Sequence, residues 1–380
     1  MSGSSPTRSW RTSPTPSRVS SHFVRALAIA FLIAASLHAE NLPRLTLAPT
    51  RDPKITRRWA LPGDPHGIAI GANGILYVGL AQKQMVMAID PKTGAVLQQV
   101  VLDSVDIAST KELLTLRTNA ARTRLYIANG SDESVTILAL PDLHVVREIT
   151  IEGEPIRDAL PDPKGRFLYL LGRRIHVFDA DGQRELHSLA VDDPMAIAVT
   201  SQGATLAVIG TESYGATRAT AVALFDTTDF HEVARDPLQT GKRIESALFA
   251  SNDSALLALG RDTLFEKPLR TNQKSMTADG ARMRMSIDFG DLVNTERICL
   301  PEGSGPQIAA LASGDRLLFA ERRCSSSGGF VGSNRTVIPV SLYNVAAYAI
   351  AFDRPSETLV VTDRAGFLTM YKVPRTPIVH

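Results

Sequence analysis

The sequence predicts an all-β fold built from repeated units. Beyond residue 60, short runs rich in Val, Ile and Leu alternate with clusters of Gly, Pro, Asp and Asn. Almost no stretch has the spacing of an amphipathic helix, and this pattern is typical of short strands joined by turns. A unit of about 40 to 48 residues also recurs along the chain, a length that indicates one supersecondary motif per repeat.

Three copies of the unit are clear, and they run over Gly63–Leu102, Gly153–Val191 and Asp192–Val233. Each contains a Pro, an apolar strand with a central Ala, a Gly-containing turn, a second strand, and a third strand that in most copies ends in Asp. A short turn and an outer strand follow. Four antiparallel strands in a repeat of this length are the unit of a β-propeller blade.

The remaining copies are less regular and cover Asp106–Ile151, Gly241 to Leu300, Ser304–Asn344 and Ala347–Val373. In the second of these, Leu264–Ala281 has no strand pattern and is predicted to be a loop insertion. The last copy supplies only three strands, and Ile55–Leu61 is expected to provide the fourth. This exchange would close the ring and remove two exposed strand edges. The sequence therefore predicts a seven-bladed β-propeller as a single domain over residues 55–380, preceded by a linker over 40–54.

The segment from Arg124 to Gly172 resembles the YVTN-type β-propeller repeat of bacterial secreted and surface proteins, a WD40-like architecture. Tyr126-Ile127-Ala128-Asn129 stands at the place of the Tyr-Val-Thr-Asn motif, and Pro161-Asp162-Pro163-Lys164-Gly165 stands at the place of Ser-Pro-Asp-Gly, one residue longer. The resemblance implies the fold specifically. It implies little about activity, because related propellers include lactonases, partners of cofactor enzymes and binding scaffolds.

Composition excludes several functional classes. The formal net charge is +2, with 41 Lys and Arg against 39 Asp and Glu, so there is no basic field for nucleic acid. No nucleophile elbow, phosphate loop, dinucleotide fingerprint or haem-attachment motif is present. The histidines of residues 40–380 have no second ligand at useful spacing, and those beyond His66 are expected on surfaces or strand edges. We therefore expect no metal and no cofactor.

The amino-terminal region has the features of an export signal. Residues 1–25 contain no acidic residue, and the apolar run Ala26–Ala39 of about 14 residues is too short for a comfortable membrane span. It matches the apolar part of a signal peptide, with cleavage expected after Ala39. An uncleaved anchor is the alternative. The prediction is a signal peptide over 1–39 and a periplasmic or secreted monomer without a stable membrane span.

Only two cysteines exist, Cys299 and Cys324. In an oxidising compartment they could form a disulfide that stabilises the fold by roughly 3 kcal/mol. Two separate thiols on adjacent strands are the alternative.

Candidate functional residues are sought where the first strand of each copy begins, because innermost strands line a propeller's channel and loops at one face form the usual site. Aligning the copies places His66, Glu112, Gln307 and Tyr348 in one column and Arg157 and Glu245 in the next. His66 is the strongest single candidate, because Pro65-His66-Gly67 fixes its register and Gly67 leaves room beside it. An imidazole with a carboxylate from the neighbouring blade can take a proton near pH 7, and Arg157 could hold an anion. Alternatively, these polar residues simply line a wet channel.

Three functions are consistent with the sequence. The first is a binding or protein-interaction scaffold, with a small molecule or protein partner at the channel mouth. The second is a lactonase-like hydrolase that uses His66, Glu112 and Arg157. The third is an accessory subunit of a periplasmic oxidoreductase. The absence of a complete catalytic or metal-binding set in the sequence favours the scaffold.

Overall fold

The structure is a computed structural model of the 380-residue chain. It describes residues 42–50, 55–102, 114–130, 133–214, 217–238, 243–249, 253, 255–260, 264–272, 275–278, 298–299, 308–310, 317–321, 328–331, 337–340, 347–353, 356, 358–363 and 365–372. Two compact units are distinguished, residues 1–42 and 43–380, and all the strands belong to the second.

Five four-stranded antiparallel sheets follow one another along the chain, each with its strands in sequence order. The first two comprise β3 (Pro65–Ile70), β4 (Leu76–Leu80), β5 (Met85–Ile89) and β6 (Val96–Val101), then β7 (Leu114–Thr118), β8 (Arg124–Asn129), β9 (Ser134–Ala139) and β10 (Val145–Thr150). The third comprises β11 (Asp158–Pro161), β12 (Phe167–Leu171), β13 (Ile175–Asp179) and β14 (Glu185–Leu189). The fourth and fifth comprise β15 (Ala196–Val199), β16 (Thr205–Tyr214), β17 (Thr217–Asp226) and β18 (Glu232–Pro237), then β19 (Ile244–Phe249), β20 (Ala255–Gly260), β21 (Leu264–Asn272) and β22 (Ser275–Ala278). Two short 3-10 helices, η1 (Ala72–Gly74) and η2 (Ala81–Lys83), occupy turns of the first sheet.

Two five-stranded sheets complete the described part. One contains β23 (Ile298–Cys299), β24 (Ile308–Ala310), β25 (Leu317–Glu321), β26 (Gly328–Val331) and β27 (Val337–Val340). The other joins both ends of the described chain, in the order β1 (Thr46–Leu47), β2 (Ile55–Ala60), β30 (Phe367–Lys372), β29 (Thr358–Asp363) and β28 (Ala347–Asp353). The amino-terminal strand β2 thus pairs antiparallel with the carboxy-terminal strand β30, with Trp59 opposite Leu368.

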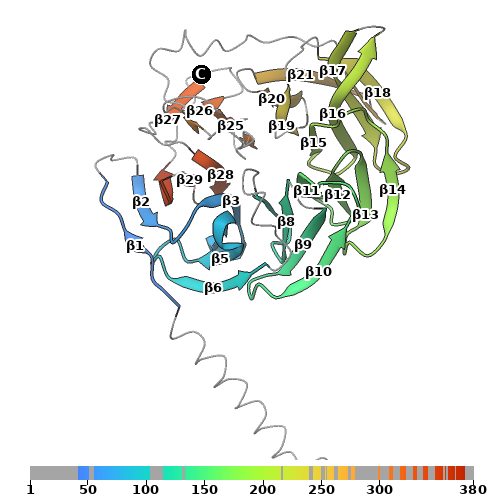
Figure 1. Ribbon diagram of the computed structural model, residues 1–380. Helices are drawn as coiled ribbons and strands as arrows, with labels where there is room; N and C mark the ends of the chain where they lie inside the picture. Colours follow the sequence, from blue (N-terminus) through green and yellow to red (C-terminus); the bar gives the residue numbers. More distant parts are fainter. Residues whose placement is uncertain are drawn as a thin grey trace, which may run out of the picture. The chain divides into compact units, whose positions relative to one another are not determined.

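In the four-stranded sheets the first strand lies on the inner side and the fourth on the outer side, as β3 and β6, β11 and β14, and β15 and β18 show (Figure 1). In the sheet that joins both ends of the described chain, β28 is the inner strand. Strand β3 contacts both β28 and β7, β7 contacts β11, and β15 contacts β19. Strand β24 in turn contacts β19 and β28. The sheets whose inner strands make these contacts are therefore neighbours in space, as successive blades of a propeller are.

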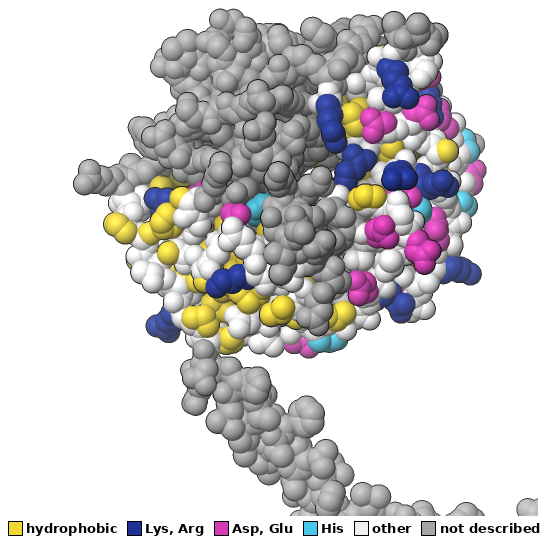
Figure 2. All heavy atoms as spheres, viewed as in Figure 1, with side chains coloured by type: hydrophobic (Ala, Val, Ile, Leu, Met, Phe, Trp, Pro, Cys, Tyr) yellow, Lys and Arg dark blue, Asp and Glu magenta, His cyan; other side chains and the backbone are white. Residues whose placement is uncertain are grey.

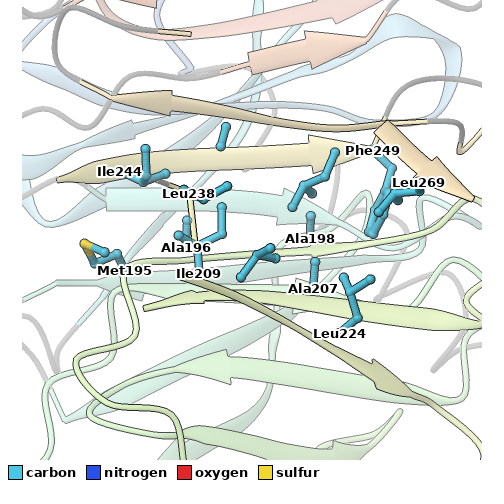
Figure 3. Packing of buried hydrophobic residues seen from close by; sticks show 13 residues of the cluster. Met195, Ala196, Ala198, Ala207, Ile209, Leu224, Leu238, Ile244, Phe249 and Leu269 are labelled. Atoms are coloured by element: carbon cyan, nitrogen blue, oxygen red, sulfur yellow. The ribbon is translucent and has the colours of Figure 1, made fainter. Parts of the chain in front are cut away.

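Apolar side chains fill the spaces between neighbouring sheets. Figure 3 shows the packing between the β15–β18 and β19–β22 sheets, where Ile209 and Leu224 from one sheet approach Phe249 and Leu269 from the other. Alternate residues of each strand face opposite neighbours, since Tyr169 packs toward the β15–β18 sheet while Leu170 packs toward β7–β10. Strand β12 is consequently packed on both faces.

One sequence prediction about this region is wrong. The sequence predicts a loop insertion over Leu264–Ala281, but β21 and β22 lie within this segment. The two strands pair antiparallel, with Leu269 opposite Ala278. The charged residues of this segment concealed the strand, because Lys267 points into the interior, where it is 1% exposed and its Nζ contacts Asp236 Oδ2 of β18.

The Pro161–Gly165 turn owes its structure to Asp162. This carboxylate is fully buried and accepts hydrogen bonds from the main-chain N–H of Lys164 and Arg166, at 3.2 and 3.1 Å. It also binds the Arg166 guanidinium, whose Nη2 donates onward to Gly203 O in the next sheet. The Asp of this motif therefore stabilises the turn and joins two blades at the end of the strands opposite to His66.

Charged and hydrophobic side chains are distributed unequally over the outer surface. Figure 2 shows charged side chains over the side where β14 to β18 lie, and hydrophobic side chains over the side of β2 to β6. Within the described residues, the large exposed hydrophobic side chains belong to outer strands only, and they are Leu47, Leu97, Val101, Val145 and Val146.

Candidate functional site

A β-bulge stands at the beginning of three innermost strands. The pairing register jumps from Pro65 to Gly67 in β3, from Ile244 to Ser246 in β19 and from Ala347 to Ala349 in β28. The residues that the three bulges contain are His66, Glu245 and Tyr348. A bulge redirects the side chain that it contains, and bulges are frequent beside functional sites.

The strands β11 and β15 begin in an equivalent way. Arg157 N donates to Leu171 O at 2.8 Å, although Leu171 already stands opposite Asp158. Met195 N likewise donates to Ile209 O at 2.6 Å, although Ile209 stands opposite Ala196. Arg157 and Met195 therefore occupy the same structural position as the three bulge residues.

These five positions, which we call the mouth positions, are His66, Arg157, Met195, Glu245 and Tyr348. The register places Arg157 and Glu245 level with His66, whereas the sequence alignment put them one residue later. That alignment missed the bulge because it followed only the alternation of apolar residues. Glu112 and Gln307, the other two sequence candidates, lie outside the described residues.

His66 is buried, with 5% of its surface exposed, and its Nε2 lies 3.0 Å from Asp64 Oδ2. The carboxylate that the structure places beside it comes from its own turn, two residues earlier. The carboxylate that the sequence predicted from the neighbouring blade, Glu112, lies outside the described residues. Asp64 is itself held, since its carbonyl accepts the N–H of Ala81 at 3.0 Å. A carboxylate at one ring nitrogen orients the imidazole and fixes its tautomer.

Gly67 has a different role from the expected one. A Cβ at this position would lie 2.3 Å from Leu114 O and 2.5 Å from a methyl carbon of Leu116. The space beside Gly67 is therefore filled by β7, and glycine is needed because two inner strands approach closely. The sequence signal was correct in marking the position, but it indicated packing between blades and not free room for a ligand.

Arg157 joins two blades. Its Nη2 donates to Gly172 O at 3.0 Å and also to Pro194 O, the residue before the mouth position Met195. Thr115 of β7 donates its hydroxyl to Arg157 O at 3.1 Å. The guanidinium thus bridges carbonyl groups of the β11–β14 and β15–β18 sheets, which fixes the spacing of neighbouring mouth positions.

A second polar cluster near this end of the strands contains His176, which the sequence placed at a surface or strand edge. His176 is instead buried, at 5% exposure, between two carboxylates. Its Nδ1 lies 2.8 Å from Glu185 Oε1 on β14, and its Nε2 lies 3.2 Å from Glu154 Oε2 in the loop before β11. Sequence periodicity could not reveal the cluster, because Glu154 is remote from β13 in the chain.

The Glu154 carboxylate is strongly held. Burial alone would raise the pKa of Glu154, but the hydrogen bond from Arg174 N at 2.9 Å and the interaction with His176 outweigh it. The pKa of Glu154 is therefore lower than its ordinary value. This cluster ties the loop before β11 to β13 and β14, and thereby supports the backbone that carries Arg157.

The described residues offer no metal site in which three His, Cys, Asp or Glu side chains gather. In the same part of the chain, no helix has the length and apolar character needed to cross a membrane. Cys299 lies in β23, whereas Cys324 is outside the described residues, so the predicted disulfide stays a prediction.

Comparison with known proteins identifies the fold. No protein-family model matches the chain, and no curated protein matches it in sequence. Among solved structures, virginiamycin B lyase from Staphylococcus aureus is similar, with a TM-score of 0.61 and 14% identity over 83% of this chain and 98% of that one. The β-propeller domain of Cps50 (Swd1) from Myceliophteria thermophila has a TM-score of 0.60 and 13% identity, over 84% and 99% of the two chains.

A catalytically inactive form of the Staphylococcus aureus lyase in complex with quinupristin gives a TM-score of 0.59 and 14% identity, over 87% of this chain and 99% of that one. At such identities the likeness shows the fold alone. Together with the four-stranded antiparallel sheets, it establishes that the chain has a β-propeller fold.

Proposed function

We propose that the protein is a binding scaffold, in which a ring of seven blades presents the mouth positions to a small molecule or a protein partner. The two five-stranded sheets would be the sixth and seventh blades, with β2 completing the last one. Support comes from the contacts that link the inner strands, including those of β28 with β3 and of β24 with β19. Support also comes from the high coverage of the solved propellers.

The observation that carries the proposal is the chemical variety of the mouth positions. The same backbone geometry recurs at His66, Arg157, Met195, Glu245 and Tyr348, and these five positions hold five different residue types. Deeper in the same strands, the residues are apolar in nearly every blade and pack against neighbours. A repeat that varies only where its strands begin is suited to recognise an asymmetric ligand there.

Binding fits the site better than catalysis because Arg157 holds carbonyl groups of two blades. A guanidinium that stabilised a developing oxyanion would instead be directed at the reacting group. The fold also fits an interaction role, because the inner strands and the loops at one face of a β-propeller form its usual binding surface.

The proposal can be tested by measuring melting temperature against a panel of small carboxylates, amines and short peptides. A ligand that binds the mouth raises the melting temperature of the wild type. The increase should disappear in His66→Ala and persist in His144→Ala. His144 is a matched control, because its Nδ1 lies 2.8 Å from Asp142 Oδ2, also two residues earlier, but at an exposed turn. Ligands that stabilise all three proteins equally would contradict the proposal.

A hydrolase or lyase is the second candidate, and the His66–Asp64 pair favours it. One structural neighbour is a lyase, although the likeness extends only to the fold. Activity on a panel of lactones that is lost in His66→Ala, at an unchanged melting temperature, would establish this alternative. If the wild type is inactive on that panel, the lactonase-like alternative is excluded and the binding scaffold is retained.

We also propose that the protein is exported, on the basis of the apolar run Ala26–Ala39. The expected mature protein begins at Glu40. The mass of the protein isolated from its native host tests this directly, because a chain that retains residues 1–39 would exclude cleavage.

A further inference from the structure

The turn between β29 and β30 contains a buried carboxylate. Asp363 is 2% exposed, and its Oδ1 accepts the N–H of Phe367 at 2.9 Å. Its main-chain carbonyl accepts the N–H of Gly366 at 3.0 Å. Gly366 has φ of +81°, which favours glycine, so the Asp363 carboxylate and the glycine together define the turn.

Arg58 of the amino-terminal strand reaches this turn. Its guanidinium carbon lies 3.9 Å from the centre of the Phe367 ring, and its Nη2 lies 3.6 Å from Asp363 Oδ2. Arg58 stands on β2, the strand that pairs with β30. The side chain therefore joins the strand exchange between the two ends of the chain to the Asp363 carboxylate.

The same turn also holds the residues that lead to the mouth. Leu61 N donates to Gly366 O at 2.8 Å, and Gly63 O would lie 3.5 Å from a Cβ at position 366. Asp64 and His66 follow immediately in the sequence. A single continuous segment, residues 58–66, thus runs from the paired strand to the mouth, and the Asp363–Phe367 turn contacts it at two places.

Burial dominates the titration of Asp363. Removal from water raises its pKa, and the N–H groups of Phe367 and Ala365 together with Arg58 do not compensate for this. Arg58 is a weak partner because its contact is long and its side chain is 27% exposed. Among the residues that the structure describes, the charged groups on the elements packed nearby are Arg58 on β2 and the Asp64–His66 pair at the beginning of β3, and the residue opposite Asp363 in β28 is Ala347. Arg364, the next residue in the chain, lies outside the described residues.

We propose that Asp363 is a positioning residue that holds residues 58–66 in place through Arg58 and the Gly366 turn. The position of His66 then depends on the pairing of β2 with β30, and we call this dependence the coupling. Protonation of Asp363 ends its charge attraction to Arg58 but also removes the larger cost of burying the carboxylate charge, so the net stability of the turn rises as Asp363 takes up a proton. A carboxyl group with a raised folded-state pKa contributes stability that is fully present below its unfolded pKa and is lost as pH rises through the folded one. The role of His66 in this inference rests on the proposed function, but the coupling itself does not.

Hydrogen–deuterium exchange of the full chain tests the coupling without any ligand. In the wild type, exchange of peptides spanning residues 55–66, corrected for intrinsic rates, should be slower at a pH below the ordinary pKa of a carboxyl group than at a pH above the raised folded-state pKa of Asp363. In Asp363→Asn the amide still accepts the Phe367 N–H but cannot titrate, so this pH dependence should disappear. In Asp363→Ala the acceptor is lost, and the same peptides should exchange faster at both pH values.

Asp179→Asn is the matched control. Asp179 organises an exposed turn of the same build in another sheet, because its Oδ1 accepts the N–H of Gln183 at 2.6 Å and its main-chain carbonyl accepts the N–H of Gly182 at 2.9 Å. This variant should leave the pH dependence of residues 55–66 as in the wild type. The proposal is overturned if Asp363→Asn keeps the wild-type pH dependence, or if Asp363→Ala exchanges as slowly as Asp363→Asn. Either result would leave the ligand-binding proposal open, because that proposal is tested by melting temperature.

Discussion

Glu154 and His176 illustrate what single residues contribute to the mouth. Both are buried, and His176 Nε2 lies 3.2 Å from Glu154 Oε2. Arg174 N donates to Glu154 Oε1, and Glu185 Oε1 lies 2.8 Å from His176 Nδ1. Buried charges are tolerated only when such partners are present. The pair therefore stabilises the loop that precedes Arg157 for as long as Glu154 remains ionised.

Replacing Glu154 with Gln should lower the free energy of unfolding at pH 7 by about 1–3 kcal/mol, because a buried charged hydrogen bond is lost. The pKa of Glu154 is lowered in the folded state, so its contribution is present above the unfolded pKa and is lost as pH falls through the folded pKa. Urea midpoints of the two proteins should therefore converge on acidification. Glu185→Gln, whose side chain is 38% exposed, should have a smaller effect. Equal losses in the two variants at pH 7 would contradict this account.

The sequence located His66 at the beginning of an inner strand but missed the buried cluster around His176, and the reason is physical. His66 follows a Pro in a repeat whose register is fixed by neighbouring apolar residues, so its position could be predicted, while its functional role stays a prediction. His176 and its two partners come from three separate parts of the chain, and only the folded sheet brings them together. The Asp64 partner of His66 was visible in the sequence, two residues away, but the alignment directed attention to the neighbouring blade.

At the scale of elements, the turns opposite the mouth join adjacent blades. Gly203, between β15 and β16, has φ of +67°, and a Cβ there would lie 2.4 Å from Asp162 Oδ1 and 2.7 Å from Arg166 Nη2. Gly165 has the same φ of +67°, but a Cβ there would meet nothing within 4 Å. Substitution of Gly165 would therefore introduce backbone strain alone, whereas substitution of Gly203 would introduce the same strain and a steric clash.

Gly165→Ala should cost about 1–2 kcal/mol of unfolding free energy, from the left-handed backbone alone. Gly203→Ala should cost about 3 kcal/mol or more, because the methyl group also displaces the buried Asp162–Arg166 pair. Chemical denaturation of the two variants measures the difference. Indistinguishable losses would show that the junction between the two blades does not contribute to stability.

Strand-level prediction was accurate wherever apolar residues alternated, as in β8 and β9, and inaccurate in β21, where a buried Lys replaced an apolar residue. The β-bulges could not be predicted from the sequence either, because an extra residue in a strand pair leaves no mark in the residue types of that strand. Their position is set by the pairing of two strands, which a single strand does not encode.

At the scale of the molecule, Trp59 reports on the strand exchange. It is one of two tryptophans in the chain, the other being Trp10. Trp59 is 5% exposed, and its Nε1 donates to Pro91 O at 3.3 Å. A Cβ on Gly94 would approach its ring to 2.6 Å. The ring of Trp59 thus connects β2 with the turn before β6.

In a Trp10→Phe background, the urea transition seen by Trp59 fluorescence should coincide with that seen by far-ultraviolet circular dichroism. Coincidence is expected because pairing of β2 with β30 is part of one cooperative structure. Gly94→Ala should shift both transitions together to lower urea. A fluorescence transition that precedes the loss of strand signal would show that β2 detaches independently, contrary to this expectation.

The strand exchange also orders events during synthesis. Thr56 donates its hydroxyl to Met370 O, a contact between residues 314 positions apart. A ribosome delivers β2 first and its partner almost last, so the amino-terminal strand keeps an unpaired edge while most of the chain is made. Contacts of such long range slow folding and leave strands exposed to aggregation. If the chain is exported unfolded, as an apolar signal segment would allow, it crosses the membrane before β2 and β30 pair, and the last blade is completed only after export.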